Sequence, residues 1–315
     1  MNRSVILSCA LMSVFALSAV NAGDVSLTKK ESGFDISIDG KFFATYHISG
    51  FAKPIVYPII GPNGEQMTRH YPMKKDVPGE ASDHHHHKSL WFTHGDVNGV
   101  DFWAETPKAG KIVLTDLVSA SVTGHTATIK IKCKWVTPDG SKTVCTDERT
   151  LRFVALKNGA RAIDWDITVH ASHGDVTFGD TKEGSMGIRT HPALRLKGPV
   201  AKGQALNSAG DTGKSLWGKK ADWVDYWGPI NGNVVGVAIF NHPSNPVSPT
   251  WWHARDYGLV AANPFGVSYF ERKKRGTGDM KIVSGKSVTF RYRFLFHKGD
   301  HKQANIPAAY AEFAK

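Results

Sequence analysis

The chain has 315 residues, with 39 Lys or Arg against 28 Asp or Glu and a formal net charge of +11. Hydrophobic residues make up 41% and charged residues 21%, which excludes a disordered chain and a protein with many membrane spans. The 31 glycines and 15 prolines follow no collagen period and therefore mark turns in a folded chain. These values indicate a basic, tryptophan-rich globular protein.

The first 22 residues differ in composition from the rest of the chain. Arg3 gives a positive start, an apolar run follows over residues 5–20, and small residues end at Ala22. This pattern predicts a secretory signal peptide over residues 1–22, because the run is shorter than a spanning helix needs. A membrane anchor is the alternative. We expect residues 23–315 to form a single β-sandwich domain, secreted or periplasmic, with no membrane contact after cleavage.

Two cysteines, Cys133 and Cys145, remain after the signal peptide is removed. An oxidising compartment favours a disulfide between them. Each lies six residues from Asp139, at the centre of the turn sequence 137–141. A hairpin that turns there places the two cysteines opposite each other on adjacent strands, so we expect the disulfide Cys133–Cys145. Two buried free thiols are the alternative.

Alternating apolar and polar residues predict long strands in the middle and near the end of the chain. The alternation covers residues 111–114, 127–135, 144–154, 161–170 and 288–296, with Gly, Asn and Asp at the breaks. A short helix is expected at the C-terminus, where Pro307 suits a first turn. The sequence therefore predicts an all-β protein, a large antiparallel β-sandwich with a short C-terminal helix.

Two long stretches show no strand alternation, residues 59–105 and residues 179–257. Both are rich in Gly, Pro and Trp, and their aromatic content argues against disorder. Connections of this length in a compact domain are usually functional. We expect the chemistry of the protein to lie in these two stretches.

A run of four histidines, residues 84–87, is followed closely by His94. In an extended segment His84 and His86 point to one side, so they form a candidate pair of ligands for a divalent metal. Neutral imidazoles also serve in proton transfer. No Cys, Asp or Glu at recognised ligand spacing completes a metal set, and a solvated loop is the simplest alternative.

Four segments of the chain resemble the secreted bacterial proteins of the "PmoA-like" domain of unknown function, common in planctomycete-type bacteria. The segments are residues 83–103, 180–189, 236–246 and 252–266, and the resemblance covers nearly the whole mature chain. The first motif of the family typically reads Asp-His-Pro-His-His-Arg. This sequence departs from it at His85, where Pro is usual, and at Lys88, where Arg is usual.

The resemblance implies a galactose-mutarotase-like supersandwich, a fold that usually handles carbohydrate. The label itself refers to methane oxygenase, which does not fit this chain. A methane monooxygenase subunit is an integral membrane protein, whereas no apolar run of spanning length follows residue 22. Because one fold hosts many functions, the residues of the candidate site decide the function.

Within these segments, residue types that suit a sugar site lie close together in sequence. Aromatic side chains offer faces for a pyranose ring, and His, Asp and Arg offer directional bonds to hydroxyls. Glu183 lies in a Gly-flanked turn, where a carboxylate can reach a cleft as a base; a surface pair with Lys182 is the alternative. The expected catalytic residues are His86, His87, His94 and Glu183, and the expected substrate-binding residues are Trp91, Arg189, His253, Arg255, Asp256 and Tyr257.

The sequence thus favours a carbohydrate-active enzyme, an epimerase, lyase or hydrolase, that uses His/Glu acid–base chemistry in an aromatic cleft. A non-catalytic glycan-binding module and an enzyme with a His-bound divalent metal are the alternatives. The positive net charge suits an anionic glycan. We expect no nucleic-acid partner, because the basic residues are scattered and the chain carries an export signal.

Overall fold

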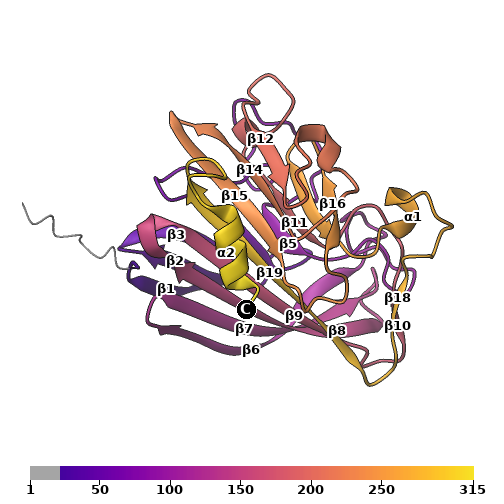
Figure 1. Ribbon diagram of the computed structural model, residues 1–315. Helices are drawn as coiled ribbons and strands as arrows, with labels where there is room; N and C mark the ends of the chain where they lie inside the picture. The colour runs from indigo at the N-terminus through magenta and orange to yellow at the C-terminus, as the bar shows by residue number, and fades with distance from the viewer. Residues whose placement is uncertain (1–21) are drawn as a thin grey trace, which may run out of the picture.

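The computed structural model describes residues 22–315, and the expected signal peptide lies, apart from its last residue, outside the described residues. The described chain is nearly all strand, with two large antiparallel sheets and a short C-terminal helix (Figure 1). The expected fold class, an all-β antiparallel sandwich with a short C-terminal helix, is confirmed. No helix within residues 22–315 has the length and apolar content to cross a membrane.

The first sheet has nine strands in the order β1-β2-β3-β4-β5-β11-β17-β16-β13. These are β1 (Val25–Lys30), β2 (Gly33–Ile38), β3 (Lys41–His47), β4 (Ile55–Ile59), β5 (Leu90–Phe92), β11 (Met186–Arg189), β17 (Leu259–Asn263), β16 (Thr250–Ala254) and β13 (Lys220–Ala221). The sheet therefore brings together three regions that are far apart in sequence.

The second sheet has eight strands in the order β12-β14-β15-β19-β9-β8-β7-β6. These are β12 (Gln204–Asn207), β14 (Trp223–Ile230), β15 (Asn233–Asn241), β19 (Ser287–Lys298), β9 (Arg161–His170), β8 (Thr143–Ala155), β7 (Thr126–Val136) and β6 (Lys111–Thr123). A small ladder pairs β10 (Val176–Phe178) with β18 (Met280–Ile282), and the helices are η1 (Lys157–Gly159), η2 (Pro192–Leu194), η3 (Gly213–Leu216), α1 (Val267–Phe270) and α2 (Ile306–Phe313).

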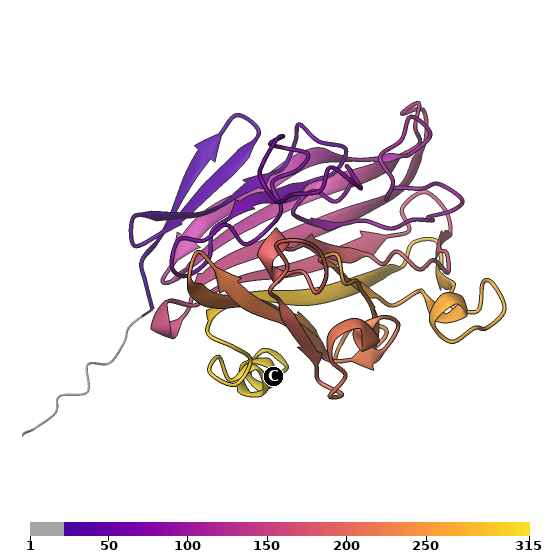
Figure 2. The ribbon, with the colours of Figure 1, turned by 90° about the horizontal axis from the view of Figure 1, so that it is seen from above.

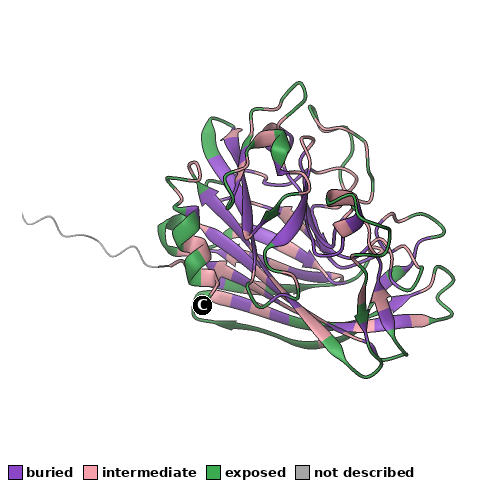
Figure 3. Cartoon of the chain, turned by 45° about the vertical axis from the view of Figure 1, so that its right-hand side comes forward, coloured by how far each residue is buried: buried purple, intermediate pink, exposed green. Residues whose placement is uncertain are grey.

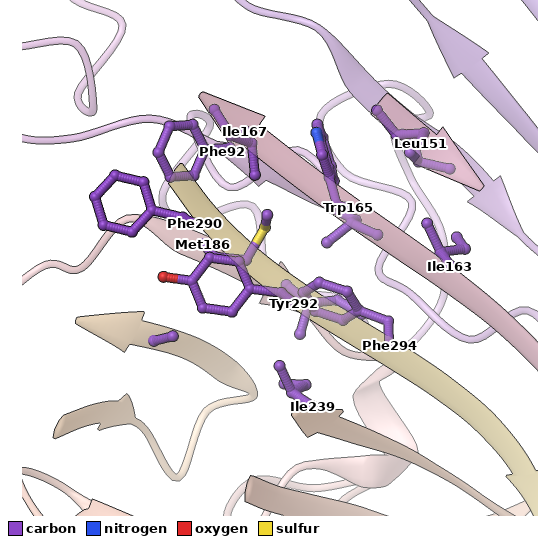
Figure 4. Close-up of a cluster of buried hydrophobic side chains, with 14 of the residues drawn as sticks. Phe92, Leu151, Ile163, Trp165, Ile167, Met186, Ile239, Phe290, Tyr292 and Phe294 are labelled. Atoms are coloured by element: carbon purple, nitrogen blue, oxygen red, sulfur yellow. The ribbon is translucent and has the colours of Figure 1, made fainter. Parts of the chain in front are cut away.

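The two sheets pack face to face, as the view from above shows (Figure 2). The main hydrophobic core contains buried side chains from both sheets. Phe92 and Met186 of the first sheet meet Trp165, Phe290 and Phe294 of the second in this core (Figure 4). Burial follows the alternation along β7 and β9, whose inward side chains are buried and whose outward side chains are more exposed (Figure 3). The period-two pattern of the sequence therefore correctly located these strands.

The expectation that residues 59–105 and 179–257 contain no strands is wrong, because β5 lies in the first stretch and β11 to β16 lie in the second. Strands β14 and β15 show no alternation of apolar and polar residues because they are buried on both faces. Their inner face lies in the core, and their outer face carries Trp223 and Phe240 under helix α2 and the segment before it. A strand covered on both sides loses the period-two signal.

The expected disulfide is also wrong: Cys133 and Cys145 are buried free thiols. They lie on adjacent strands, but the register pairs Cys133 with Asp147 and Cys145 with Trp135. A register shift beside Trp135 moves the turn, so the two cysteines are diagonal neighbours on the inner face. Diagonal neighbours are about 7–8 Å apart, too far for a disulfide.

Two thiols should therefore react with a maleimide when the mature protein is denatured without reductant. A count of two by intact mass supports the register seen here. A count of zero before reduction and two after it would instead establish the disulfide.

Beneath helix α2, the second sheet holds a buried pair between His297 of β19 and Asp225 of β14. His297 Nε2 lies 3.0 Å from Asp225 Oδ1, and both side chains are almost fully buried. Burial acts to lower the pKa of His297, but the Asp225 carboxylate outweighs it and raises the pKa above its usual value. Stability from this pair is therefore complete below the unfolded pKa of about 6.5 and is lost as pH rises through the folded pKa.

We expect Asp225→Asn to lower the free energy of unfolding by about 3 kcal/mol near pH 6, because it leaves His297 buried without its charge partner. The difference from wild type should shrink as pH rises to about 9. Denaturant unfolding at both pH values measures it. Asp164→Asn is the control, since its partner Arg293 does not titrate in this range; equal pH dependence in both variants would contradict the assignment.

Candidate functional site

A cavity of about 600 Å³ opens on the face of the first sheet that points away from the core. Alternation along the strands produces this face: Leu90 and Phe92 enter the main core, whereas Trp91 between them joins a second cluster with Trp103 and Leu259. The cavity is lined by His84, His86, His87, Gly95, Asp101, Trp103, Ala104, Thr181, Lys182, Glu183, His253, Arg255, Tyr257 and Leu259. The structure thus brings together the two stretches in which chemistry was expected.

Arg69 holds the histidine loop, residues 81–88, in place. Its guanidinium donates to the backbone carbonyls of Ala81 at 3.1 Å, Asp83 at 2.9 Å and His84 at 2.9 Å, and to the Asp83 carboxylate at 2.5 Å. The Arg69 side chain is almost fully buried. A buried guanidinium is strongly destabilising without hydrogen-bond acceptors. Movement of the loop away from Arg69 would therefore leave this charge unpaired or expose it to water.

Arg189, on β11, connects the loop to the sheet. It donates to Asp83 Oδ1 at 2.9 Å and contacts His87 Nδ1 at 3.0 Å, and its guanidinium lies 4.6 Å from the centroid of the Tyr257 ring. Burial acts to raise the pKa of Asp83, but Arg189, His84 and Arg69 outweigh it and hold the pKa below its usual value. Asp83 is therefore an ionised carboxylate shared by two arginines.

His87 is a neutral imidazole with a fixed tautomer. A guanidinium only donates, so Nδ1 of His87 accepts from Arg189 and the ring proton lies on Nε2. Burial, helped by His86 and Arg189, lowers the pKa of His87 well below its usual value. The ring stacks on Trp91 at 5.4 Å. His87 therefore offers a hydrogen-bond donor to a ligand and is not positioned as a base.

His253, on β16, has the same tautomer for a different reason. The indole Nε1 of Trp217 donates to His253 Nδ1 at 3.2 Å, which leaves the proton of the neutral ring on Nε2. Burial, with Arg255 and Lys182 nearby, lowers the pKa of His253 to about 3. Two imidazole N–H donors from opposite ends of the sequence thus line one cavity.

Three other cavity residues carry groups suited to chemistry or binding. Burial, with Lys53 and His84 nearby, lowers the pKa of His86 to about 3, so its ring is neutral. Glu183 is paired with Lys182 at 2.5 Å, as the surface alternative expected, but the carboxylate also lines the cavity. The Arg255 guanidinium has no ion-pair partner within residues 22–315.

A buried charge triad supports the loop from the other side. Glu105 accepts ion pairs from Lys53 and Lys88, and its backbone carbonyl contacts His85 Nε2 at 3.2 Å. Burial lowers the pKa of Lys53 to about 8, although Glu105 opposes this. Lys88 therefore acts here as a partner of Glu105, and His85 lies against the triad rather than in the cavity.

Four expected site residues do not reach the cavity. His94 is fully buried, with Nε2 donating to the Gly179 carbonyl at 2.7 Å and Nδ1 at 3.1 Å from Ser185 Oγ, so it is structural and not catalytic. Trp91 and Arg189 do not line the cavity and hold His87 from behind, so they are not placed to contact a ligand there. Asp256 points away, toward Lys214 at 3.8 Å.

The expected metal pair, His84 and His86, has ring centroids 5.8 Å apart. Within residues 22–315, no group of three or more His, Cys, Asp or Glu side chains is placed to hold a metal ion. Nδ1 of His84 also lies 3.0 Å from Asp83 Oδ2, so one nitrogen already has a partner. The two imidazoles alone do not form a metal site.

Sequence reasoning missed the residues that organise the cavity, above all Arg69, Trp103 and Lys53. Nothing in the sequence around Arg69 marks it, because its acceptors are backbone carbonyls 12 to 15 residues later. Trp103 replaces Trp91 as the tryptophan that lines the cavity. Its position at the end of the first motif was the only available signal.

A family model described as a family of unknown function (DUF6807) matches residues 33–311, so the chain belongs to this family. The description names neither methane oxygenase nor a bacterial group, and the expected label therefore stays a prediction. No protein of curated function matches the chain in sequence.

Several solved structures of low similarity match most of the length of this chain. Galactose 1-epimerase from Lactobacillus acidophilus NCFM has 8% identity and a TM-score of 0.39, over 89% of this chain and 100% of that chain. A GalM/aldose epimerase homologue from C. elegans has 6% identity and a TM-score of 0.33, over 88% and 99%. A galactose mutarotase related enzyme from Lactobacillus acidophilus has 11% identity and a TM-score of 0.28, over 87% and 97%. Likenesses this distant carry no argument about the cavity.

We expect Arg69→Ala to lower the free energy of unfolding by about 3 kcal/mol. The substitution leaves backbone carbonyls of the histidine loop without a donor and removes one of the two cations paired with the Asp83 carboxylate. Amide hydrogen exchange should quicken over residues 81–88. Arg152→Ala is the matched control, since its 2.8 Å pair with Asp166 is partly exposed and worth at most about 1 kcal/mol. Equal effects of the two variants would contradict the role of Arg69.

Proposed function

We propose that this member of the DUF6807 family binds a carbohydrate in the cavity lined by His84, His86, His87 and His253, and acts on it by acid–base chemistry. The observation that carries the proposal is the set of groups on one cavity. Two imidazoles fixed as N–H donors, His87 and His253, share it with a carboxylate, Glu183, and an unpaired guanidinium, Arg255. Such a mixture of fixed donors and a proton acceptor suits a ligand rich in hydroxyl groups.

The size and the aromatic walls of the cavity support a sugar ligand. A volume of about 600 Å³ lies in the range of small-molecule sites. The rings of Trp103 and Tyr257 line it and provide apolar surface for the faces of a pyranose. Tyr257 is held by contacts with Arg189 and Arg255, so its ring orientation is fixed before a ligand arrives.

The acid–base pair that we propose is Glu183 with an imidazole of the 84–87 run. His87 supplies a hydrogen bond rather than a proton acceptor, because Arg189 occupies its Nδ1. His86 is neutral and lines the cavity. Epimerisation, elimination and hydrolysis of sugars can all use groups of this kind to donate or accept a proton.

An anionic sugar, carrying a carboxylate or sulfate group, is the ligand class that the charges favour. Arg255 lines the cavity without an ion-pair partner among residues 22–315. Two parallel N–H bonds from a guanidinium match a carboxylate or sulfate oxygen pair. The formal net charge of +11 would also draw an anionic glycan toward the surface.

A non-catalytic glycan-binding module is the second candidate. The 2.5 Å contact between Lys182 and Glu183 favours it, because Lys182 occupies one oxygen of this carboxylate. A sugar enzyme that uses a metal held by His84 and His86 would need further ligands from substrate or water. Metal analysis of the wild type and of His86→Ala tests that version.

Export to a secreted or periplasmic location is part of the proposal. It follows from the signal-peptide pattern of residues 1–22 and from the resemblance to secreted bacterial proteins. A polysaccharide outside the cytoplasm is the partner that this location offers, and neither a nucleic acid nor a membrane is proposed as one. Mass spectrometry of the N-terminus of the exported protein checks cleavage after residue 22.

We expect Arg255→Ala to weaken binding of a uronate-containing oligosaccharide by about 10- to 100-fold, because a charge-assisted hydrogen bond is lost. Binding of the neutral counterpart should change little. Titration calorimetry of both ligands measures this, with Arg152→Ala as the control. Equal losses for charged and neutral sugars would contradict the anionic assignment.

Glu183→Gln separates the enzyme from the module. We expect it to keep sugar binding and to reduce turnover by about 10²- to 10⁴-fold, because the carboxylate exchanges a proton with substrate. Product analysis on a panel of glycans bound by the wild type measures turnover. Sugars that bind the wild type but are left unchanged by it would establish the module.

A further inference from the structure

Of the four imidazoles that line the cavity, three have a side-chain partner at Nδ1, and the partner of His84 differs in chemistry from the other two. Nδ1 of His84 lies 3.0 Å from Asp83 Oδ2, whereas His87 and His253 receive donors at Nδ1. An ionised carboxylate at this distance attracts a ring proton and repels a ring lone pair, so in the neutral ring Nδ1 of His84 carries the proton and Nε2 holds the lone pair. His84 is therefore oriented as a proton acceptor, with the opposite tautomer from its neighbours.

Asp83 is held in place for this contact by two arginines. Its Oδ1 receives Arg69 at 2.5 Å and Arg189 at 2.9 Å, which leaves Oδ2 for His84. Arg69 also binds the backbone carbonyls of both Asp83 and His84, at 2.9 Å each. The carboxylate and the backbone on both sides of the imidazole are thus fixed by one buried guanidinium.

The backbone and the ring of His84 are constrained as well. His84 has a φ of +44°, a left-handed conformation that a side chain adopts only where its surroundings impose it. The ring stacks on His87 at 4.8 Å and on Tyr257 at 5.3 Å, with interplanar angles of 6° and 11°. The side chain is still 41% exposed and lines the cavity, so a ligand can reach it.

We propose that His84 is the catalytic base of this site and that Asp83 is its positioning residue. This deepens the proposed function and rests on it. Nε2 of His84 takes a proton from the bound sugar: the bond from that proton to its carbon or oxygen breaks, an N–H bond forms, and the electron pair stays on the substrate. Asp83 stabilises the resulting imidazolium, as a carboxylate does in a catalytic triad.

The other two imidazoles fit this assignment. The negative charge left on the substrate develops near His87 and His253, both of which present Nε2–H to the same cavity. Preorganised donors of this kind stabilise charge as it forms. One base and two donors are thus produced from the same residue type by an Asp, an Arg and a Trp behind them.

The tautomers can be measured on the full mature protein without a substrate. In protein labelled with ¹⁵N-histidine, long-range ¹H–¹⁵N spectra distinguish a ring protonated at Nδ1 from one protonated at Nε2. His84→Gln removes one ring and assigns its signals, and His173→Gln, an exposed residue remote from the cavity residues, is the matched control. A neutral His84 protonated at Nδ1 supports the proposal, and one protonated at Nε2 overturns it.

Asp83→Asn tests the positioning role. Its amide can donate to Nδ1, so the His84 signals should change to the Nε2–H form while those of His253 stay the same. An unchanged His84 tautomer in this variant overturns the role of Asp83. The His253 signals report at the same time that the variant is folded.

Turnover separates this inference from the proposed function. On a sugar that the wild type converts, His84→Gln should reduce kcat by about 10²- to 10⁴-fold with binding retained. Full turnover in that variant overturns the base assignment and leaves the sugar enzyme standing. A wild type that converts none of the sugars it binds overturns the enzyme, whatever the tautomer of His84.

Discussion

Two almost fully buried guanidinium groups, those of Arg69 and Arg189, require a negative partner, and both find it in Asp83. Burying a charge is destabilising unless the charge is paired and hydrogen-bonded, so loss of this contact would strongly lower the stability of the fold. The loop that carries Asp83 is therefore held against the first sheet. The positions of His84 and His87 follow from it, because one touches the Asp83 carboxylate and the other touches Arg189.

The same buried charges decide what each histidine can do. An imidazole has one donor and one acceptor when neutral, and a partner that only donates or only accepts removes the choice between tautomers. Arg189 and Trp217 make donors of His87 and His253, and Asp83 makes an acceptor of His84. The positive surroundings and the burial keep His86, His87 and His253 neutral. Chemical variety here comes from the partners, since the residue type is constant.

Strand β11 of the first sheet accommodates both the cavity and the core. Gly187, on β11, faces the cavity side, and a Cβ there would lie 2.9 Å from the Trp91 ring. Because Gly187 has no Cβ, the Trp91 ring can lie against this strand, and His87 stacks on Trp91. The opposite face of the same strands packs into the core through Met186 and Ile188. One short strand thus serves the core with one face and the site with the other.

The sequence by itself determined the fold class, the long strands of the second sheet, the C-terminal helix and the two stretches that supply the cavity, because alternation and motif content are local properties. Only the tertiary structure decided the rest. Strands β14 and β15 lack alternation since both faces are buried, and a register shift beside Trp135 separates Cys133 from Cys145. His94 was an expected catalytic residue but is buried in structural hydrogen bonds, whereas Arg69 was not expected and organises the site. Partners distant in sequence set burial, register and tautomer, and no local pattern encodes them.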